Sequence, residues 1–270
     1  MVLIGEKLNK IAVIITTFLR DELLQKTVNR LIENWNEQYV VFIGNQSYQT
    51  EEEKLKGFSD FCLNLDDPTH LTDNKIQHYS LPYDCGLSYA RNFLVEKANE
   101  SGCDYILLMA DSLQVSKIYD FSNIIGFLEE DNNRGIVGLD IQDRCAWEHD
   151  LSLIEGESFY LSIPKREPIK YKELSFQPVD ICRNFFLAKT KVLLESKWDN
   201  ELKVTEHEDF FYRLKINTNY KVYFNNSIKC IYIKDKPSEY NKKRRRIYTE
   251  FKRKLLNKYN IKNWMKVERR

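Results

Sequence analysis

Glycine and proline are scarce in this sequence, with nine and six residues among 270. Their scarcity excludes collagen-like repeats and, with 43% hydrophobic residues, argues against a disordered or loop-rich chain. The net charge is only +1, because 41 Lys and Arg face 40 Asp and Glu. Bulk charge therefore indicates no nucleic-acid or acidic partner. The composition predicts one large globular domain or two small ones.

Paired cysteines and long apolar runs are also missing from the sequence. The six cysteines include no CxxC pair and no cluster with histidine at zinc-finger spacing, so we expect reduced thiols in a cytoplasmic protein. The first apolar run, residues 11–15, is much shorter than the roughly 20 residues of a membrane-spanning helix. We expect neither a signal peptide nor a transmembrane helix.

Buried-strand patterns alternate with helical patterns over the first 140 residues. Continuous apolar runs at 11–15, 39–43 and 105–109 are typical of strands buried on both faces. Apolar residues recur at helical spacing over 21–35 and 87–99. The alternation predicts an α/β fold with a mainly parallel sheet flanked by helices.

The loops after three of these strands, 16–20, 44–47 and 110–112, should share one cleft, because ligands in such sheets lie beyond the carboxyl ends of the strands. Further elements are expected in the second half: strands at 134–139, 158–163 and 181–187 and a helix at 189–196.

The first segment with chemical potential leads from Gly86 to Asp111. A carboxylate at the end of a central parallel strand can bind a divalent cation that bridges a diphosphate. Arg91, near the start of the predicted helix, can contact anionic oxygens or hold the helix start. The alternative for Asp111 is a turn or cap with no chemical role.

The second segment places three acids and a histidine, Glu206 to Asp209, at the start of an apolar helical run. The helix dipole there favours ionised carboxylates, and an ionised Asp can accept a proton from an attacking hydroxyl. The alternative is a capping box, with Thr205 at the cap and Glu208 three residues later.

The segments occur in a definite order: a βα opening, Gly86-x-Ser88-x-Ala90-Arg91-Asn92, a strand ending in an acid, Arg183-Asn184-Phe-Phe-Leu-Ala188-Lys189, and Glu208-Asp209. This order resembles the GT-A-fold glycosyltransferases of the family-2 type. The closing pattern, a Trp-Asp pair and then Glu-His-Glu-Asp-Phe-Phe-x-Arg-Leu, is similar to that of β-1,4-galactosyl- and N-acetylgalactosaminyltransferases. The resemblance covers residues 10–235 and implies a GT-A (Rossmann-like) domain over 1–235.

The resemblance implies an inverting glycosyltransferase that moves a hexose or N-acetylhexosamine from a nucleotide sugar, with UDP as the expected nucleotide, to an acceptor hydroxyl. In the pair Glu208 and Asp209, the family pattern makes Asp209 the catalytic base. A divalent cation, Mn or Mg, would neutralise the leaving diphosphate with Asp111 as its ligand. The implied acceptor belongs to a glycan or a lipid-linked oligosaccharide.

The resemblance also implies the donor residues, which are Thr16, Phe18, Arg20, Asn45, Arg91, Asp111, Arg183 and Asn184.

The residues expected at the acceptor follow from their own chemistry. Trp147 and Trp198 can stack on a sugar face, and core packing is the alternative for each ring. His149 follows a predicted strand and can line the acceptor site, with a solvated loop residue as the alternative. Glu206 and His207, beside the expected base, are assigned to the acceptor as well, and a surface position is the alternative for His207.

The metal motif departs from the family pattern. The family carries Asp-x-Asp, whereas only Asp111 remains here, and no histidine follows the Glu208-Asp209 pair. Lys234 or Lys236 occupies that neighbourhood and can neutralise a diphosphate directly. We therefore predict weak or dispensable metal binding.

The end of the chain is strongly basic, with 15 Lys or Arg against four acids in residues 234–270. Ile247, Phe251, Leu255 and Tyr259 recur at helical spacing, which predicts a basic amphipathic helical extension over 236–270. Three interpretations stay open: a peripheral contact with the anionic inner membrane face, a contact with nucleic-acid phosphates, or packing on the domain with solvated charges.

Two other functions also stay open. The basic extension fits a transferase that glycosylates DNA bases, as some phage enzymes do. The degraded Asp-x-Asp motif fits a catalytically inactive module that binds sugar nucleotides or nucleic acid.

Overall fold

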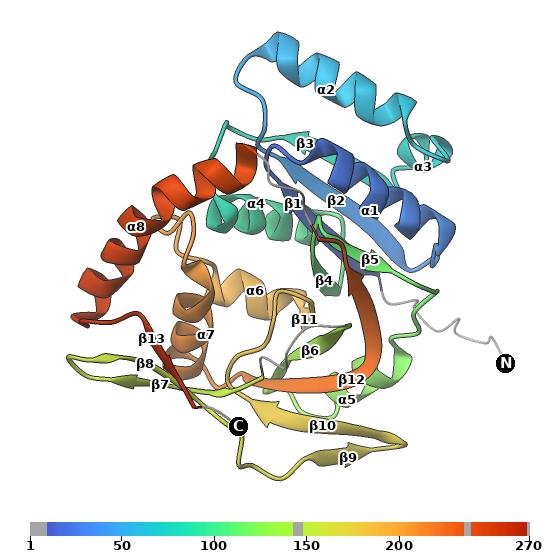
Figure 1. Ribbon diagram of the computed structural model, residues 1–270. Coiled ribbons are helices and arrows are strands. Elements are labelled where there is room, and N and C mark those ends of the chain that lie inside the picture. The colour runs from blue at the N-terminus through green and yellow to red at the C-terminus, as the bar shows by residue number, and fades with distance from the viewer. Residues whose placement is uncertain (1–9, 143–147, 235–238, 269–270) are drawn as a thin grey trace, which may run out of the picture.

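A computed structural model describes residues 10–142, 148–234 and 239–268 (Figure 1). Its strands are β1 Ile11–Thr17, β2 Tyr39–Asn45, β3 Ile76–Ser80, β4 Tyr105–Ala110, β5 Leu113–Val115, β6 Arg134–Gln142, β7 Asp150–Ile154, β8 Ser158–Ser162, β9 Ile169–Tyr171, β10 Leu174–Val179, β11 Phe186–Lys189, β12 Lys221–Tyr232 and β13 Met265–Val267. Its helices are α1 Asp21–Glu33, α2 Glu51–Leu63, α3 Thr69–Thr72, α4 Leu87–Glu100, α5 Ser122–Glu129, α6 Thr190–Ser196, α7 Glu206–Asn217 and α8 Glu239–Tyr259.

The central sheet of the described residues has the order β3-β2-β1-β4-β11-β6-β12-β10-β9, and β5 pairs with β12. The first four strands are parallel, as the buried runs predicted, with Ile11 opposite Tyr39 on one side and Tyr105 on the other. β11 then runs antiparallel to both of its neighbours. The predicted α/β fold with a mainly parallel sheet is confirmed for this half, and the other half is mixed.

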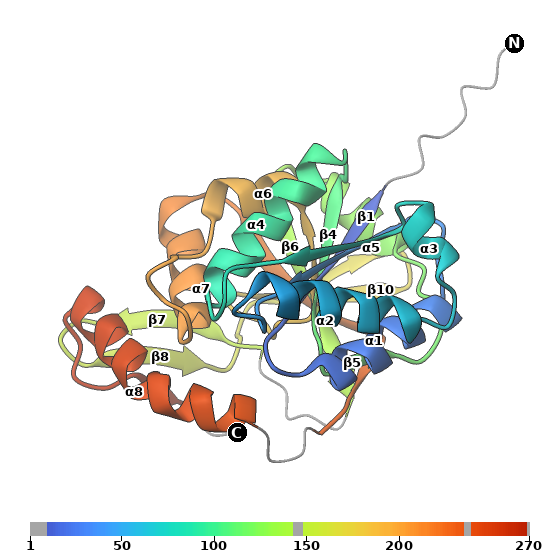
Figure 2. The same cartoon turned by 90° about the horizontal axis from the view of Figure 1, so that it is seen from above.

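Helices cover both faces of the sheet, because alternate side chains of β1 enter two separate cores. Val13 and Ile15 pack with α1 and α5, whereas Ala12 and Ile14 pack with α4, α6 and α7. Figure 2 shows α4 and α6 on one side of the strands and α1 on the other. This arrangement leaves the carboxyl ends of β1, β2 and β4 as the place where loops meet.

The C-terminal segment folds onto this body. Phe251 and Leu255 of α8 are buried, and Leu255 belongs to the core beneath α4 and α7. β13 adds a parallel strand to β8, which pairs antiparallel with β7. The predicted apolar stripe of this helix therefore packs on the domain, and α8 crosses beside the start of α7 (Figure 1).

Two smaller expectations concern membranes and thiols. Across the helices of the described residues, none combines the length and apolar character that a bilayer span requires. Five cysteines, Cys62, Cys85, Cys103, Cys182 and Cys230, are free thiols, and Cys145 lies outside the described residues.

Candidate active site

A cleft of about 430 Å³ opens at the carboxyl ends of β1 and β4. Its walls come from the ends of these strands, the start of α7 and one side of α8. Nine residues that the sequence assigned to the site line this cleft: Thr16, Arg20, Arg91, Asp111, Arg183, Asn184, Glu206, His207 and Glu208. The first predicted segment and the second therefore meet in one place.

The Gly86-to-Asn92 motif holds the start of α4 against the loop before α7. The Ser88 hydroxyl donates to the Leu202 carbonyl at 2.6 Å, and the Asn92 side-chain amide donates to the Trp198 carbonyl at 2.8 Å. Gly86 has a φ of +91°, and a Cβ there would lie 2.8 Å from the Lys203 Cα. Only glycine fits this close approach without strain.

Arg91 extends this contact into the cleft through a buried ion pair. Its Nη1 lies 2.8 Å from Glu206 Oε1, and both side chains are almost fully buried. The guanidinium also lies 5.4 Å from the centre of the Trp198 ring. Arg91 thus joins α4 to the first residue of α7, and removing either charge would leave the other buried and uncompensated.

Asp111 follows β4 and is completely buried. Its Oδ2 accepts hydrogen bonds from the Thr17 hydroxyl at 2.9 Å and from Arg20 Nε at 3.0 Å. Arg20 Nη2 forms an ion pair with the other oxygen, Oδ1. The Thr27 hydroxyl donates to the Asp111 carbonyl at 2.7 Å, so α1 and β1 fix this residue from two sides.

These contacts do not fit a divalent cation. Both carboxylate oxygens of Asp111 already accept hydrogen bonds, and a cationic guanidinium lies where a metal ion would bind. Within residues 10–142, 148–234 and 239–268, no three His, Cys, Asp or Glu side chains gather closely enough to hold a metal. Lys234 is exposed outside the cleft, and Lys236 lies outside the described residues.

Glu208 presents a different kind of carboxylate to the cleft. It is 2% exposed, and its Oε2 makes no hydrogen bond to the described residues. Burial raises the pKa of Glu208 to about 8, and the negative charges of Glu206 and Asp209 add to the increase. The backbone N–H of Glu208 and the nearby Trp264 side chain act in the opposite direction and lower this pKa. A carboxylic acid with a pKa near neutrality can take up and release a proton under ordinary conditions.

His207, between these acids, is neutral. Its burial lowers the pKa to about 3, and the positive charges of Arg91 and Arg183 contribute to the decrease. Both arginines therefore lie close to this ring.

Asp209 lies outside this cleft. Its carboxylate is fully buried on another side of α7, where Oδ2 accepts from Arg213 Nε at 2.8 Å. Oδ1 accepts from the Tyr259 hydroxyl at 2.7 Å and lies 2.6 Å from Lys258 Nζ. The resemblance makes Asp209 the base, but its carboxylate lies away from the lining of this cleft, because α7 turns Glu208 and Asp209 in different directions.

The alternative capping box is not formed either. Thr205 is the N-cap of α7 with a φ of +67°, and its side chain makes no capping hydrogen bond. The Thr205 hydroxyl instead donates to the Phe251 carbonyl of α8 at 3.3 Å.

Trp198, His149 and Phe18 lie apart from the lining of this cleft. Trp198 stacks on Phe210 in the core, with ring centres 4.4 Å apart. His149 is buried beside Ile181, and Trp147 lies outside the described residues. Phe18 packs edge-on against Tyr83 at 5.5 Å, next to the cleft rim.

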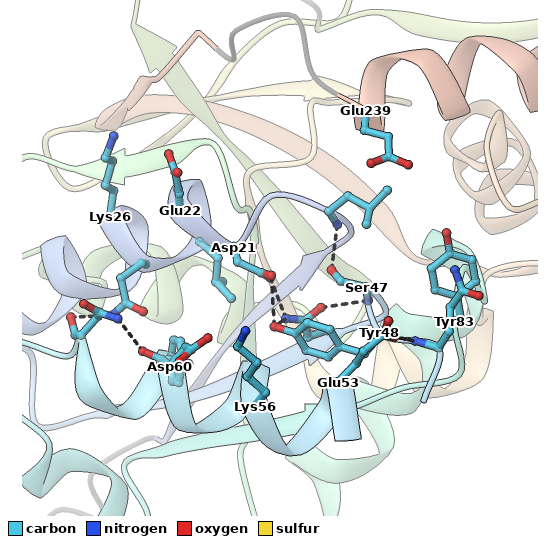
Figure 3. A pocket seen from close by; sticks show the side chains of 18 of the residues that line it. Asp21, Glu22, Lys26, Ser47, Tyr48, Glu53, Lys56, Asp60, Tyr83 and Glu239 are labelled. Atoms are coloured by element: carbon cyan, nitrogen blue, oxygen red, sulfur yellow. Dashed lines mark hydrogen bonds between the residues drawn. The ribbon is translucent and has the colours of Figure 1, made fainter. Parts of the chain in front are cut away.

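Asn45 belongs to a neighbouring cavity of about 860 Å³, lined by residues of α1 and α2. Figure 3 shows this cavity, with Asp21 and Tyr48 joined by a hydrogen bond. The Asn45 side-chain amide donates to Asp21 at 2.9 Å, and the Tyr48 hydroxyl donates to the other Asp21 oxygen at 3.1 Å. Burial and the Asp21 charge raise the pKa of Tyr48. Leu19 lines this cavity and Arg20 lines the cleft, so the expected single cleft is divided at this loop.

α8 contributes side chains to the cleft that the sequence did not assign to it. Tyr240, Arg244 and Tyr248 follow each other at intervals of four residues and all line the cleft. Trp264 lines it too and packs edge-on against Tyr248 at 5.5 Å. The available signal was the four-residue spacing of these side chains, which continues the apolar face of Phe251 and Leu255 at intervals of seven residues.

No family model matches the sequence, and no curated protein matches it. Solved structures do. The chain is similar to S. aureus TarS 1-349 in complex with UDP-GlcNAc, with a TM-score of 0.55, 12% identity, and 92% of this chain and 67% of that chain covered. It is similar to GalNAc-T7 with UDP, GalNAc and Mn2+, with a TM-score of 0.62, 13% identity, and 86% and 45% covered. A mannosyltransferase from Pyrobaculum calidifontis, in complex with GDP-Man and Mn2+, gives a TM-score of 0.57 at 10% identity, with 92% and 64% covered.

These similarities define a class: the chain has the GT-A glycosyltransferase fold. The sequence resemblance is thereby confirmed at the level of the fold. The chain spans 40% of the chain in a crystal structure of S. aureus TarS and 45% of the GalNAc-T7 chain.

Proposed function

We propose that this protein is a glycosyltransferase that moves a sugar from a nucleoside-diphosphate donor to an acceptor hydroxyl with inversion at the anomeric carbon. The cleft at the carboxyl ends of β1 and β4 would hold the diphosphate and the sugar. The larger cavity, which contains Asn45 and Ser47 beyond β2, would receive the nucleoside. A UDP-sugar is the expected donor, since TarS and GalNAc-T7 were solved with UDP-GlcNAc and with UDP.

Glu208 is the base in this proposal. The acceptor hydroxyl gives its proton to Oε2 of Glu208 while the hydroxyl oxygen forms a bond to the anomeric carbon of the donor sugar. The bond from that carbon to the diphosphate oxygen breaks, and the electron pair leaves with the nucleoside diphosphate. The proton on Glu208 is later released to solvent, so the reaction needs no covalent intermediate.

Fixed positive charges support the other half of the reaction. Arg20, Arg91 and Arg183 line the same cleft, where charge would build on the leaving group. Guanidinium groups donate two parallel hydrogen bonds to phosphate oxygens. In a largely buried site such donors stabilise the transition state more than they would in water.

The observation that carries the proposal is the Glu208 carboxyl: it is buried, its Oε2 makes no hydrogen bond to the described residues, and it lies in a cleft with arginines on a GT-A fold. Asp209, by contrast, has both oxygens paired with the side chains of Arg213 and Tyr259.

The test is donor hydrolysis and transfer with UDP-GlcNAc, UDP-GalNAc, UDP-glucose and GDP-mannose. We expect release of a nucleoside diphosphate from one of them by the wild type. Glu208→Gln should retain donor binding and lower the rate by about a thousandfold. Glu201→Gln is the matched control, because Glu201 is exposed and lies outside the cleft.

Two outcomes would contradict the proposal. Full activity in Glu208→Gln would remove Glu208 as the base. Donor binding without release of nucleoside diphosphate in the wild type would instead favour a sugar-nucleotide-binding module.

A further inference from the structure

α8 forms part of the cleft wall through one side of the helix. Tyr240, Arg244 and Tyr248 are spaced by four residues and therefore lie on one face. Phe251 and Leu255, further along the helix, are buried and attach it to the domain. Residues seven positions apart lie on nearly the same side of a helix, so Phe251 and Leu255 continue the face of Arg244 and Tyr248. Their burial on the domain therefore keeps this face turned toward the cleft.

The first turn of α8 is held at the cleft rim by aromatic and cationic contacts. The Arg20 guanidinium lies 4.2 Å from the centre of the Tyr240 ring, and the same Arg20 binds Asp111. Lys243 forms a hydrogen bond with the Tyr83 hydroxyl. Arg244 Nη1 donates to the Tyr240 hydroxyl at 2.7 Å, so its position is coupled to that of Arg20.

Arg244 adds a fourth guanidinium to those of Arg20, Arg91 and Arg183 in the cleft lining. These groups are close enough to influence each other: the charge of Arg244 acts to lower the pKa of Arg91, and Glu206 acts to raise that of Arg244. The sequence places Arg244 more than 150 residues after Arg91, so only the fold brings them together.

Arginines outnumber acids in the lining of the cleft. Four arginines lie there with three acids, Asp111, Glu206 and Glu208, and burial raises the pKa of Glu208 to about 8. Such an excess of guanidinium groups suits a nucleoside diphosphate, which is an anion.

We propose that this arginine cluster, completed by Arg244 from α8, binds the donor diphosphate in place of a divalent cation. The inference rests on the proposed function, because it concerns the same donor. It explains why the Asp-x-Asp motif is reduced to one acid: Asp111 orients Arg20 through two contacts instead of coordinating a metal. It also gives the basic C-terminal helix a role in the site.

The experiment measures nucleotide affinity of the full chain by calorimetry, in buffer with EDTA and in buffer with MnCl2. The probes are UDP, GDP, CDP and ADP, each paired with its monophosphate. We expect the best diphosphate to bind with a Kd that differs by less than about threefold between the two buffers, and more tightly than its monophosphate.

Arg244→Gln should weaken diphosphate binding about tenfold in EDTA and leave monophosphate binding nearly unchanged. The diphosphate affinity of Arg244→Lys should lie between those of the wild type and Arg244→Gln, because lysine keeps the charge but lacks the planar guanidinium group. Arg245→Gln is the matched control: it removes the same charge from the next position of α8, and Arg245 is exposed and lies outside the cleft. Thermal melting checks that each variant is folded.

A tenfold or larger gain in affinity on adding MnCl2 would overturn the metal-independent assignment while leaving the proposed function standing. Equal diphosphate affinities of the Arg244→Gln and Arg245→Gln variants would show that Arg244 of α8 is not part of the donor site. Failure of every diphosphate to bind in both buffers would overturn the proposed function together with this inference.

Discussion

Replacement of Glu208 with glutamine should make the protein more stable at neutral pH and, in the same variant, lower turnover by about a thousandfold. The folded protein holds this carboxyl in a buried position with a pKa of about 8, whereas the ordinary value is 4.5. Between these two pH values the folded state binds a proton that the unfolded state releases. Stability contributed by this group therefore falls as the pH rises through the window from 4.5 to 8.

The magnitude follows from the size of that window. Between the two pKa values, each increase of one pH unit lowers the unfolding free energy by about 1.4 kcal/mol. The cost is therefore about 3 kcal/mol at pH 7 and about 1 kcal/mol at pH 5. Glutamine has nearly the same shape and does not titrate, so the variant escapes this cost.

The assay is urea unfolding of the wild type and of Glu208→Gln at pH 5, 6, 7 and 8. The difference in unfolding free energy should grow with pH, from about 1 to about 3 kcal/mol between pH 5 and 7. Glu201→Gln, an exposed position, should show no such growth. A difference that does not change with pH, or a variant less stable than the wild type at pH 8, would refute the assignment of a buried, protonated Glu208.

Three further perturbations test other parts of the site. The kcat/KM of the wild type, taken from initial rates, should rise with pH and level off above an apparent pKa of about 8, because the base must be ionised. A kcat/KM that falls between pH 7 and 9 would contradict this prediction. Asp209→Asn should lower the unfolding free energy by about 2–3 kcal/mol, since it removes a charge held by Arg213, Tyr259 and Lys258. Turnover per folded molecule should be retained. Loss of turnover without loss of stability would restore Asp209 as the base. Gly86→Ala should lower the free energy of unfolding, measured by heat or urea, by about 2 kcal/mol or more. Gly102→Ala should lower it less, because both glycines have a positive φ but only Gly86 lies against Lys203. Equal effects of the two variants would show that the close approach is unimportant.

The strands and helices around the cleft were predictable because their signals are local. The apolar run of β1 is buried from both sides, and the helical spacing of α1 and α4 reflects one packed face of each helix. Since parallel strands bring their carboxyl ends to one edge, the placement of Thr16 and Asp111 in one cleft followed from these elements.

The motif around Arg91 could be recognised in the sequence, but the role of Arg91 could not be predicted from it. Whether Arg91 contacts a ligand or holds the helix start depends on which residue comes to lie opposite it. In the fold that residue is Glu206, more than 100 positions away, so Arg91 both pairs with α7 and faces the cleft.

Sequence alone determined the strands β1, β2 and β4, the helices α1 and α4 and the two segments that meet in the cleft, because periodicity and turn composition act over a few residues. Tertiary structure decided which carboxylate faces the cleft. Glu208 and Asp209 are adjacent in the chain, yet a helix turns each residue by about 100° from the last, and α8 returns to engage Asp209 through Tyr259. The same return brings Arg244 to the cleft, and no local pattern encodes a contact between residues so far apart.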